Sequence, residues 1–225
     1  MKADLQVVQE RFTVQVANTP GLVREAHRLR YQVYCVENDY LDGDGLEVDE
    51  FDLHSHHVIM RDNVTGEVVG TVRLVLWQQG MPEASFPIQQ VTLASLRHYV
   101  PLRTTAEVSR FAVSKARRDL VGVKAGLLRL VLVQGLVRLS AELGISHWVA
   151  VMEPGLLRLL KGSSIHFNPI GKPIEYHGLR QCCYAKIDEL LTRVYEDRPK
   201  VWDLLTDGGT LWPAPGSLGE RILAA

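Results

Sequence analysis

The spacing of apolar positions in the first half of the chain predicts four strands and one helix. Four segments carry β-branched residues in runs or in period-two alternation, which is typical of strands. They span residues 12–17, 57–60, 68–76 and 106–113. Thr19 and Pro20 supply a helix N-cap and a first helical residue, and apolar positions then recur on one helical face as far as Val33. Residues 62–66 have the composition of a hairpin turn between the second and third strands.

The second half of the chain predicts helices packed around a central strand. Residues 120–143 have a near-continuous apolar surface, with Arg129, Gln134 and Arg138 among their polar positions, which predicts a helix buried against a sheet. The remaining elements are expected as a strand at 148–152, a helix at 154–160, a hairpin at 174–187 and a last helix at 189–205. Strands and helices do not alternate regularly. The pattern therefore favours an α/β (α+β) fold with a twisted, mostly antiparallel mixed sheet and helices on both faces.

The chain is organised as one domain in this interpretation. No internal repeat or Pro/Ser-rich linker divides it, so we expect a single domain over residues 1–207. Glycine and proline crowd together beyond that point, which predicts a loose C-terminal tail over residues 208–225.

Charge and hydropathy exclude several classes of protein. Lys plus Arg number 25 and Asp plus Glu number 26, so no global positive charge attracts nucleic acid by counterion release. The most apolar run, residues 125–137, is too short to span a bilayer, and we expect no integral membrane protein. Asp4, Glu10 and Arg11 stand where a secretory signal would be apolar, which favours a cytoplasmic location.

Several familiar sites are not expected. Cys35, Cys182 and Cys183 form no CxxC pair, which argues against a disulfide framework and a zinc site. On a strand, His56 and His57 point to opposite faces, so structural contacts with the neighbouring acidic loop are favoured over a metal. The chain also lacks GxGxxG, GxxxxGK[ST] and GxSxG motifs. We therefore expect no metal and no dinucleotide, P-loop or α/β-hydrolase chemistry.

Two predicted strands carry charges where apolar residues are expected. Arg73 interrupts one strand, and alternation in the next places Glu107 and Ser109 on one face and Arg110 on the other. Buried charges are costly when unpaired, which favours an ion network that either fixes a loop or binds substrate. Its expected members are Arg73, Arg110, Glu107, Asp49 and Asp52. Glu107, with a hydroxyl two residues on, is the candidate general base.

The order of these residues resembles the motif set of the acyl-homoserine-lactone autoinducer synthases. Five blocks occur in order, with similar spacing, over about the first 115 residues. They contain Arg30, Tyr34, Tyr40, Glu47, Asp49, Phe51, Asp52, residues 70–74, Glu107, Ser109, Arg110 and Phe111. The blocks LRYQVYCVEN, GLEVDEFDLHSHH, GTVRLVL and SFPIQQ are still closer to the acyltransferases associated with the PEP-CTERM/exosortase system. Those enzymes are similar to long-chain N-acyl amino acid synthases.

The resemblance implies the GNAT acyltransferase fold, in which the sheet splits into a V-shaped cleft for a pantetheine-linked thioester. It implies transfer of a fatty acyl group from acyl carrier protein to the amino group of an amino acid or similar small amine. Glu107 and Ser109 would be catalytic, no cofactor would be tightly bound, and the carrier's acyl-phosphopantetheine would be the donor. The residues expected to bind substrate are Arg30, Tyr34, Tyr40, Asp49, Asp52, Arg73, Arg110 and Phe111.

Two departures from related sequences bear on the substrates. Tyr40 stands where lactone synthases usually carry Trp, in the region associated with S-adenosylmethionine. A lactone synthase with S-adenosylmethionine as co-substrate is therefore the alternative and not the leading interpretation. Residues 117–122 do not match the R/Q-x-x-G-x-G/A loop of acetyl-CoA-dependent members, which leaves room for a carrier protein as donor. A non-catalytic acyl-binding module is the second alternative, although a buried carboxylate such as Glu107 would contribute little to a site that only binds.

A fatty acyl chain needs an apolar slot, which we expect between the strand at 148–152 and the following helix. The expected lining is Val149, Val151, Met152, Leu156, Leu157 and Phe167. Basic residues also cluster around the start of the long helix, where they would attract a phosphate or the acidic surface of a carrier protein. They are Lys115, Arg117, Arg118 and Lys124.

Overall fold

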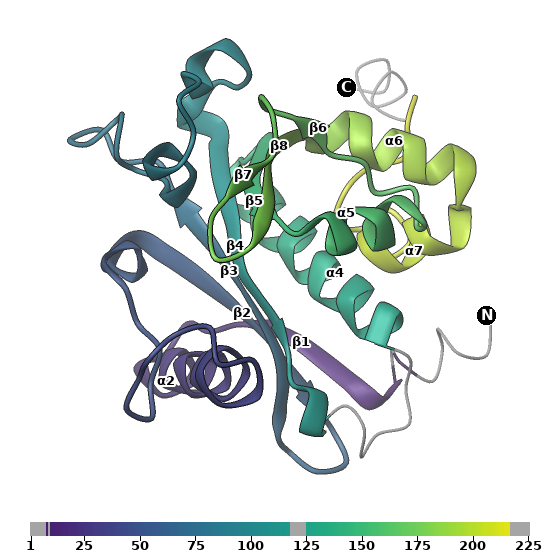
Figure 1. Cartoon of the computed structure of the whole chain (residues 1–225). Helices are drawn as coiled ribbons and strands as arrows, with labels where there is room; N and C mark the ends of the chain where they lie inside the picture. The colour runs from purple at the N-terminus through teal and green to yellow at the C-terminus, as the bar shows by residue number, and fades with distance from the viewer. Residues whose placement is uncertain (1–7, 9, 118–124, 217–225) are drawn as a thin grey trace.

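The computed structural model describes residues 8, 10–117 and 125–216 (Figure 1). One open eight-stranded sheet runs through it in the order β1-β2-β3-β4-β5-β8-β6, with β7 paired to β8. The strands are β1 (Phe12–Val16), β2 (Ser55–Asp62), β3 (Val68–Leu76), β4 (Thr105–Val113), β5 (His147–Met152), β6 (Asn168–Pro169), β7 (Ile174–Glu175) and β8 (Leu179–Lys186). β4 and β5 are parallel and the other neighbours antiparallel, which confirms the expected mixed sheet.

Helices cover both faces of this sheet, with α2 on one face and α4 to α7 on the other (Figure 1). The α-helices are α2 (Pro20–Tyr31), α4 (Ala125–Leu143), α5 (Pro154–Lys161), α6 (Ile187–Asp197) and α7 (Pro199–Thr206). Thr19 caps α2 as expected, because its hydroxyl accepts from the Leu22 N–H at 3.3 Å. Short helices complete the fold: the π-helix η1 (Gln32–Glu37), which continues α2, and the 3-10 helices η2 (Glu50–His54), η3 (Pro87–Gln90), η4 (Leu96–His98) and η5 (Leu102–Thr104).

The apolar surface of α4 is explained by its enclosure between the sheet and the last helices. Leu132 and Leu136 are buried in the largest core cluster. Gly135 marks the closest approach to the sheet, because a Cβ there would collide with Val14 and Val58. The predicted buried helix is confirmed over its described part, which begins at Ala125. None of the described helices has the length and apolar composition needed to cross a membrane.

The sheet divides between β4 and β5. These strands pair only where residues 105–107 lie beside 147–149, although β4 continues to Val113 and β5 to Met152. In the described chain no other strand pairs with this edge of β4 beyond Glu107. The two strands therefore diverge there, and the divergence forms the cleft described below.

The C-terminal region differs from the sequence prediction. The prediction of a single helix over residues 189–205 is wrong, because the segment forms two helices, α6 and α7, with a break at Arg198. Pro199 lacks an N–H and disfavours helical backbone at the residue before it. Leu211 and Trp212, inside the predicted loose tail, pack against the core, and the Leu211 N–H donates to the Thr206 carbonyl at 2.8 Å. Residues 217–225 lie outside the described part of the chain.

Candidate active site

Glu107 is buried in β4 at the point where β4 and β5 diverge, with 2% of its surface exposed. One carboxylate oxygen accepts a hydrogen bond from the backbone N–H of Ile88 at 2.7 Å. Burial raises the pKa of Glu107 to about 8, and the opposing effects of that hydrogen bond and of Arg73 and Arg110 are smaller. A carboxyl group with this pKa can exchange a proton near neutral pH.

Ser109 lies two residues beyond Glu107 on the same face of β4, as alternation predicted. It is opposite Arg73 of β3, whose Nε donates to the Ser109 hydroxyl at 3.0 Å. Arg73 is fully buried, and its Nη2 has no hydrogen-bond partner within the described residues. Glu107, Ser109 and this unpaired guanidinium nitrogen therefore occupy neighbouring positions on one face of two strands.

Arg110 does not lie on the opposite face from Glu107 and Ser109, so that part of the sequence prediction is wrong. The register of β3 against β4 shifts between Thr71 and Arg73, and Arg110 adopts a positive φ of 52°. This bulge interrupts the period-two alternation. It places Arg110 Nη2 at 2.8 Å from Glu47 and 2.9 Å from Asp49.

The predicted ion network exists, but it lacks Glu107 and includes Arg30 and Glu47, which were not among its expected members. Arg30 donates to Glu47 and, through both Nη atoms, to Asp52 at 2.6 and 3.1 Å. Arg73 Nη1 contacts Asp49 and lies 2.9 Å from Asp52. Glu107 makes no ion pair within the described residues, which corrects its expected membership. Glu47 takes that place, and its position two residues before Asp49 was the available sequence signal.

The network fixes the charge states of its members. Burial alone would raise the pKa of Asp52, but hydrogen bonds and charge contacts with Arg30 and Arg73 hold it well below its usual range. Burial likewise opposes the charge of Arg110, yet its hydrogen bonds to Glu47 raise the pKa of the guanidinium. The two side chains of the Asp49–Asp52 capping box also accept backbone N–H groups. The segment that follows η1 is thereby held against β3 and β4.

Tyr34 and Tyr40 both line the cleft. Tyr34 belongs to the π-helix η1, a type of helix often found at functional sites. The guanidinium carbon of Arg110 lies 5.8 Å from the Tyr34 ring centroid, and burial raises the pKa of Tyr34 to about 12. Tyr40 is 46% exposed and is therefore available to contact a bound molecule.

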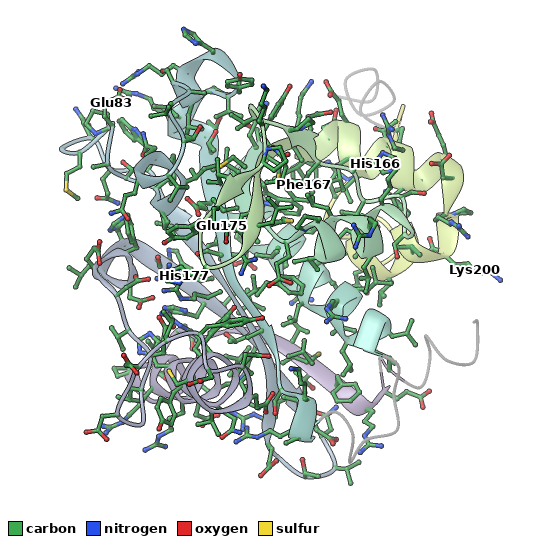
Figure 2. All side chains as sticks on the ribbon, in the orientation of Figure 1. Glu83, His166, Phe167, Glu175, His177 and Lys200 are labelled. Carbon is green, nitrogen blue, oxygen red and sulfur yellow. The ribbon has the colours of Figure 1, made fainter. Side chains whose placement is uncertain are left out.

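The cleft itself has a volume of about 550 Å³. Glu107, Ser109, Arg110 and Phe111 line it from β4, and six residues between 151 and 159 line it from β5, α5 and the residue that joins them. The β7–β8 hairpin forms another part of the wall, with His177 at its tip (Figure 2). The structure therefore brings the candidate base, the Arg110 guanidinium and both tyrosines to one continuous space.

A smaller apolar cavity of about 70 Å³ adjoins the cleft. Four of the six residues expected to line an acyl slot line this cavity: Val151, Met152, Leu156 and Phe167. Val149 does not line it, because it packs with the cluster that contains Ile88. Leu157 is absent from the lining too and packs against the main core. The α4 residues that line the cavity were not predicted, since nothing in a uniformly apolar helix distinguishes a cavity wall from ordinary core.

The predicted basic cluster is only partly described. Lys115 lines the cleft, and its Nζ donates to Asn38 Oδ1 at 2.7 Å. Arg117 donates to the Val68 carbonyl and lies 3.7 Å from Glu67. Arg118 and Lys124 lie outside the described residues, so docking of a carrier protein by these four side chains stays a prediction.

His27, Asp52 and His57 place three ligand-type atoms within 4.8 Å of one another. Asp52 Oδ1, however, already accepts hydrogen bonds from Arg30 and Arg73. Burial, together with the nearby charge of Arg30, lowers the pKa of His57 to about 3 and lowers the pKa of His27. The Asp52 carboxylate is used by two guanidinium groups, whose positive charges also act on both imidazoles, so this arrangement belongs to the network.

Comparisons with known proteins agree with this geometry. Residues 29–126, which include the network and Glu107, match the family model for the acetyltransferase (GNAT) domain. The fold is similar to that of TofI, solved in a ternary complex with an inhibitor and MTA, with 19% identity, a TM-score of 0.62, and coverage of 86% of this chain and 96% of TofI. A search of curated protein sequences gives no match.

Two further solved structures have similar folds and are named as two different kinds of synthase. BjaI, a CoA-dependent acyl-homoserine lactone synthase solved with MTA, is 23% identical, with a TM-score of 0.60 and coverage of 88% of each chain. FeeM, an N-acyl amino acid synthase from uncultured soil microbes, is 15% identical, with a TM-score of 0.58 and coverage of 81% of this chain and 94% of FeeM. The match of residues 29–126 to the GNAT acetyltransferase domain makes the protein an acyltransferase by class. The predicted fold and enzyme class are confirmed.

Proposed function

We propose that the protein is an N-acyltransferase that moves an acyl group from acyl carrier protein to the amino group of an amino acid or similar small amine. The observation that carries the proposal is the placement of Glu107. This carboxyl is buried, has a pKa near 8, and lines the polar cleft where the sheet divides, two residues before Ser109, which lines both the cleft and the apolar cavity.

Amide formation needs a neutral amine, whereas amino groups are mostly protonated at neutral pH. In the proposed reaction the Glu107 carboxylate accepts a proton from the acceptor ammonium, and the amine nitrogen then attacks the thioester carbon. Glu107 releases this first proton to solvent through the cleft. The carbon–sulfur bond of the tetrahedral intermediate then breaks, and the second proton of the attacking nitrogen passes by way of Glu107 to the leaving thiolate. A base in this position typically accelerates such a step by about 10² to 10⁴.

The remaining polar groups have supporting roles in this proposal. Ser109 and Arg73 orient the acceptor or a water beside Glu107, since Arg73 Nη2 has a free donor there. Backbone N–H groups on the open edge of β4 beyond Glu107 are candidates to stabilise the oxyanion, at about 3 kcal/mol per donor. No side-chain nucleophile is required, because the amine attacks directly.

Acyl-phosphopantetheine is the proposed donor, with no tightly bound cofactor. Lys115 and Arg117, with Arg118 and Lys124, supply the positive charge that would attract the phosphate or the acidic carrier surface. The sequence blocks quoted above support a place among the acyltransferases of the PEP-CTERM/exosortase system. That association stays a proposal.

A lactone synthase that uses S-adenosylmethionine is the second candidate. It is favoured by the likeness of the fold to those of TofI and BjaI, both solved with MTA. The Tyr that stands at position 40 in place of Trp argues against it. The two candidates differ in their products, because only the lactone reaction releases methylthioadenosine.

The test is a product analysis by mass spectrometry. The full chain is incubated with acyl carrier protein loaded with an acyl group, together with either a mixture of amino acids or S-adenosylmethionine. The proposal predicts N-acyl amino acids in the first reaction and no methylthioadenosine in the second. Methylthioadenosine with an acyl lactone would establish the second candidate, and thioester hydrolysis without an amide would reject both.

A further inference from the structure

Glu107 has one hydrogen-bond donor among the described residues, and this donor belongs to the connection between β3 and β4. It is the backbone N–H of Ile88, 2.7 Å from Oε2, in residues 82–89, which we call the η3 segment. Oε1 accepts no hydrogen bond within the described chain. Because Glu107 lines the cleft, Oε1 is the oxygen left to exchange a proton with a bound molecule. The position of the Ile88 N–H therefore affects both the orientation of the carboxyl group and the stability of its charged form.

The η3 segment covers the face of the sheet that bears Glu107. Val75 of β3 and Val149 of β5 are the residues paired with Glu107 across the sheet, and directly paired residues project from the same face. Phe86 and Ile88 are fully buried in one apolar cluster with these two valines. These apolar contacts hold the segment against the sheet. They are non-directional, however, and do not by themselves aim an N–H at a carboxylate.

The direction of this N–H depends on the side chain of Gln89. Its Oε1 accepts the Phe86 N–H at 2.9 Å, and its Nε2 donates to the Pro82 carbonyl at 3.1 Å. Pro87 has no N–H, so the N–H groups of Phe86 and Ile88 are successive donors along the segment. Gln89 accepts from the first of them and the candidate base from the second. The Gln89 amide thus closes the turn before η3 and leaves the Ile88 N–H directed at the carboxyl group.

Two further side chains hold the residues before η3. The buried Ser85 hydroxyl accepts the Gln78 N–H and donates to the Met81 carbonyl, each at 2.8 Å. The Ser85 carbonyl accepts from His54 Nε2 at 2.9 Å. His54 is the last residue of η2, the helix that carries an acid of the ion network. The η3 segment is therefore attached to the network on one side and to Glu107 on the other.

We propose that Gln89 is a positioning residue for the base: it holds the η3 segment so that the Ile88 N–H stabilises the Glu107 carboxylate and leaves Oε1 open to the cleft. The proposal rests on the proposed function, because it gives Glu107 the role of base. Gln89 acts through the backbone and is not part of the cleft lining, whereas Pro87 is. Loss of a hydrogen bond to the charged form raises the pKa of a carboxyl group. Without Gln89, the base should therefore stay protonated to a higher pH.

The hydrogen bond itself is tested in the parent by NMR, with heavy nitrogen incorporated at isoleucine. The Ile88 amide signal is identified by its absence from the spectrum of Ile88→Val. This amide proton should move downfield as Glu107 ionises, with a midpoint near pH 8, and should not titrate in Glu107→Gln. An Ile88 amide that does not titrate in the parent would overturn the proposal.

Two glutamine variants locate the effect in Gln89. Gln89→Met keeps the length of the side chain but forms neither of its hydrogen bonds, so the midpoint should rise by about one pH unit. Gln90→Met is the matched control and should keep the parent midpoint, because the exposed Gln90 amide contacts exposed Glu50 at 3.4 Å. Where Gln89→Met folds poorly, Ser85→Ala removes the other side-chain bonds of the segment and should raise the midpoint too. A lower melting temperature with an unchanged midpoint would show a merely structural role and contradict the proposal.

The titration needs no substrate, which separates this inference from the proposed function. In acyl transfer, the inflection of kcat/KM with pH should move by the same amount in Gln89→Met and stay in place in Gln90→Met. A raised midpoint in a protein that forms no amide with any amine would leave the role of Gln89 standing and reject N-acyl transfer. Amide formation with an unchanged Glu107 midpoint in Gln89→Met would do the reverse.

Discussion

The carboxylate of Glu107 accepts its hydrogen bond from the Ile88 backbone and not from the guanidinium of Arg73, although Arg73 lies diagonally across the β3–β4 pair. Arg73 is directed instead to Asp49 and Asp52. An ion pair would have held Glu107 ionised at a low pKa. Its absence leaves the carboxyl with a pKa near 8, and this separation underlies the predictions that follow.

The pH dependence of stability should change when Glu107 is neutralised. Because its pKa is raised in the folded protein, Glu107 binds a proton between about pH 4.5 and 8 that the unfolded chain does not hold. Its contribution to stability is present below about pH 4.5 and is lost as pH rises through about 8. The melting temperature of Glu107→Gln, relative to the parent, should therefore increase from pH 5 to pH 9. A constant difference between the two proteins would contradict the raised pKa.

Removal of a network guanidinium should be strongly destabilising. Arg73→Met leaves the three carboxylates of the network with two guanidinium groups, and this excess of buried negative charge should cost about 3 to 5 kcal/mol in the free energy of unfolding. Arg110→Met should cost less, because its side chain is 26% exposed. Urea unfolding of each variant measures the change in its free energy of unfolding. A melting temperature of Arg73→Met within about a degree of the parent would show that the charges are not buried.

The two neutral histidines should make the fold sensitive to acid. Burial lowers the pKa of His57 to about 3 and also lowers that of His27. Each contributes stability above about pH 6.5 that is lost as pH falls through the window down to its folded pKa, by at most about 1.4 kcal/mol per pH unit. The slope of unfolding free energy between pH 6 and 4 should be smaller in His57→Gln. His98→Gln, at an exposed position, is the control and should keep the parent slope.

Docking of a carrier protein should depend on charge near the start of the long helix. Arg117→Glu combined with Arg118→Glu should raise the Michaelis constant for acyl carrier protein far more than for free acyl-pantetheine, and added salt should have the same effect on the parent. Arg97→Glu, on the 3-10 helix η4, serves as a matched control. Equal losses with both donors would assign the two arginines to phosphate binding or folding.

The sequence predicted the elements better than the details of the site. Hydrophobic spacing located β1 to β5, α2 and α4 because these elements bury one face or are enclosed, but it did not predict the two-residue strand β6. It could not find the bulge at Arg110, since a positive φ at a non-glycine residue leaves no periodic signal. It also joined α6 to α7, although Pro199 was a visible reason to separate them.

The charges were predicted as a group but not as pairs. Buried charges without partners would cost free energy, and the sequence offered the acidic residues around Asp49 as partners for the arginines. The three-dimensional arrangement decides which carboxylate has no ion pair. Glu47 pairs with Arg30 and Arg110, whereas Glu107, which was expected in the network, pairs with no arginine in the described residues. The cavity beyond the cleft depended on packing between α4 and the divergent strands, which no local pattern encodes.

The central claim is that Glu107 accepts the proton of the acceptor amine. It is tested most directly by kcat/KM for acyl transfer from pH 6 to 9.5, measured in parallel for the parent, Glu107→Gln and the exposed control Glu83→Gln. The parent and Glu83→Gln should rise about tenfold per pH unit and level off near pH 8, at the same pH for acceptors with different amine pKa values. Glu107→Gln should be at least about tenfold slower and lack this inflection. Superimposable profiles for the parent and Glu107→Gln would contradict the account.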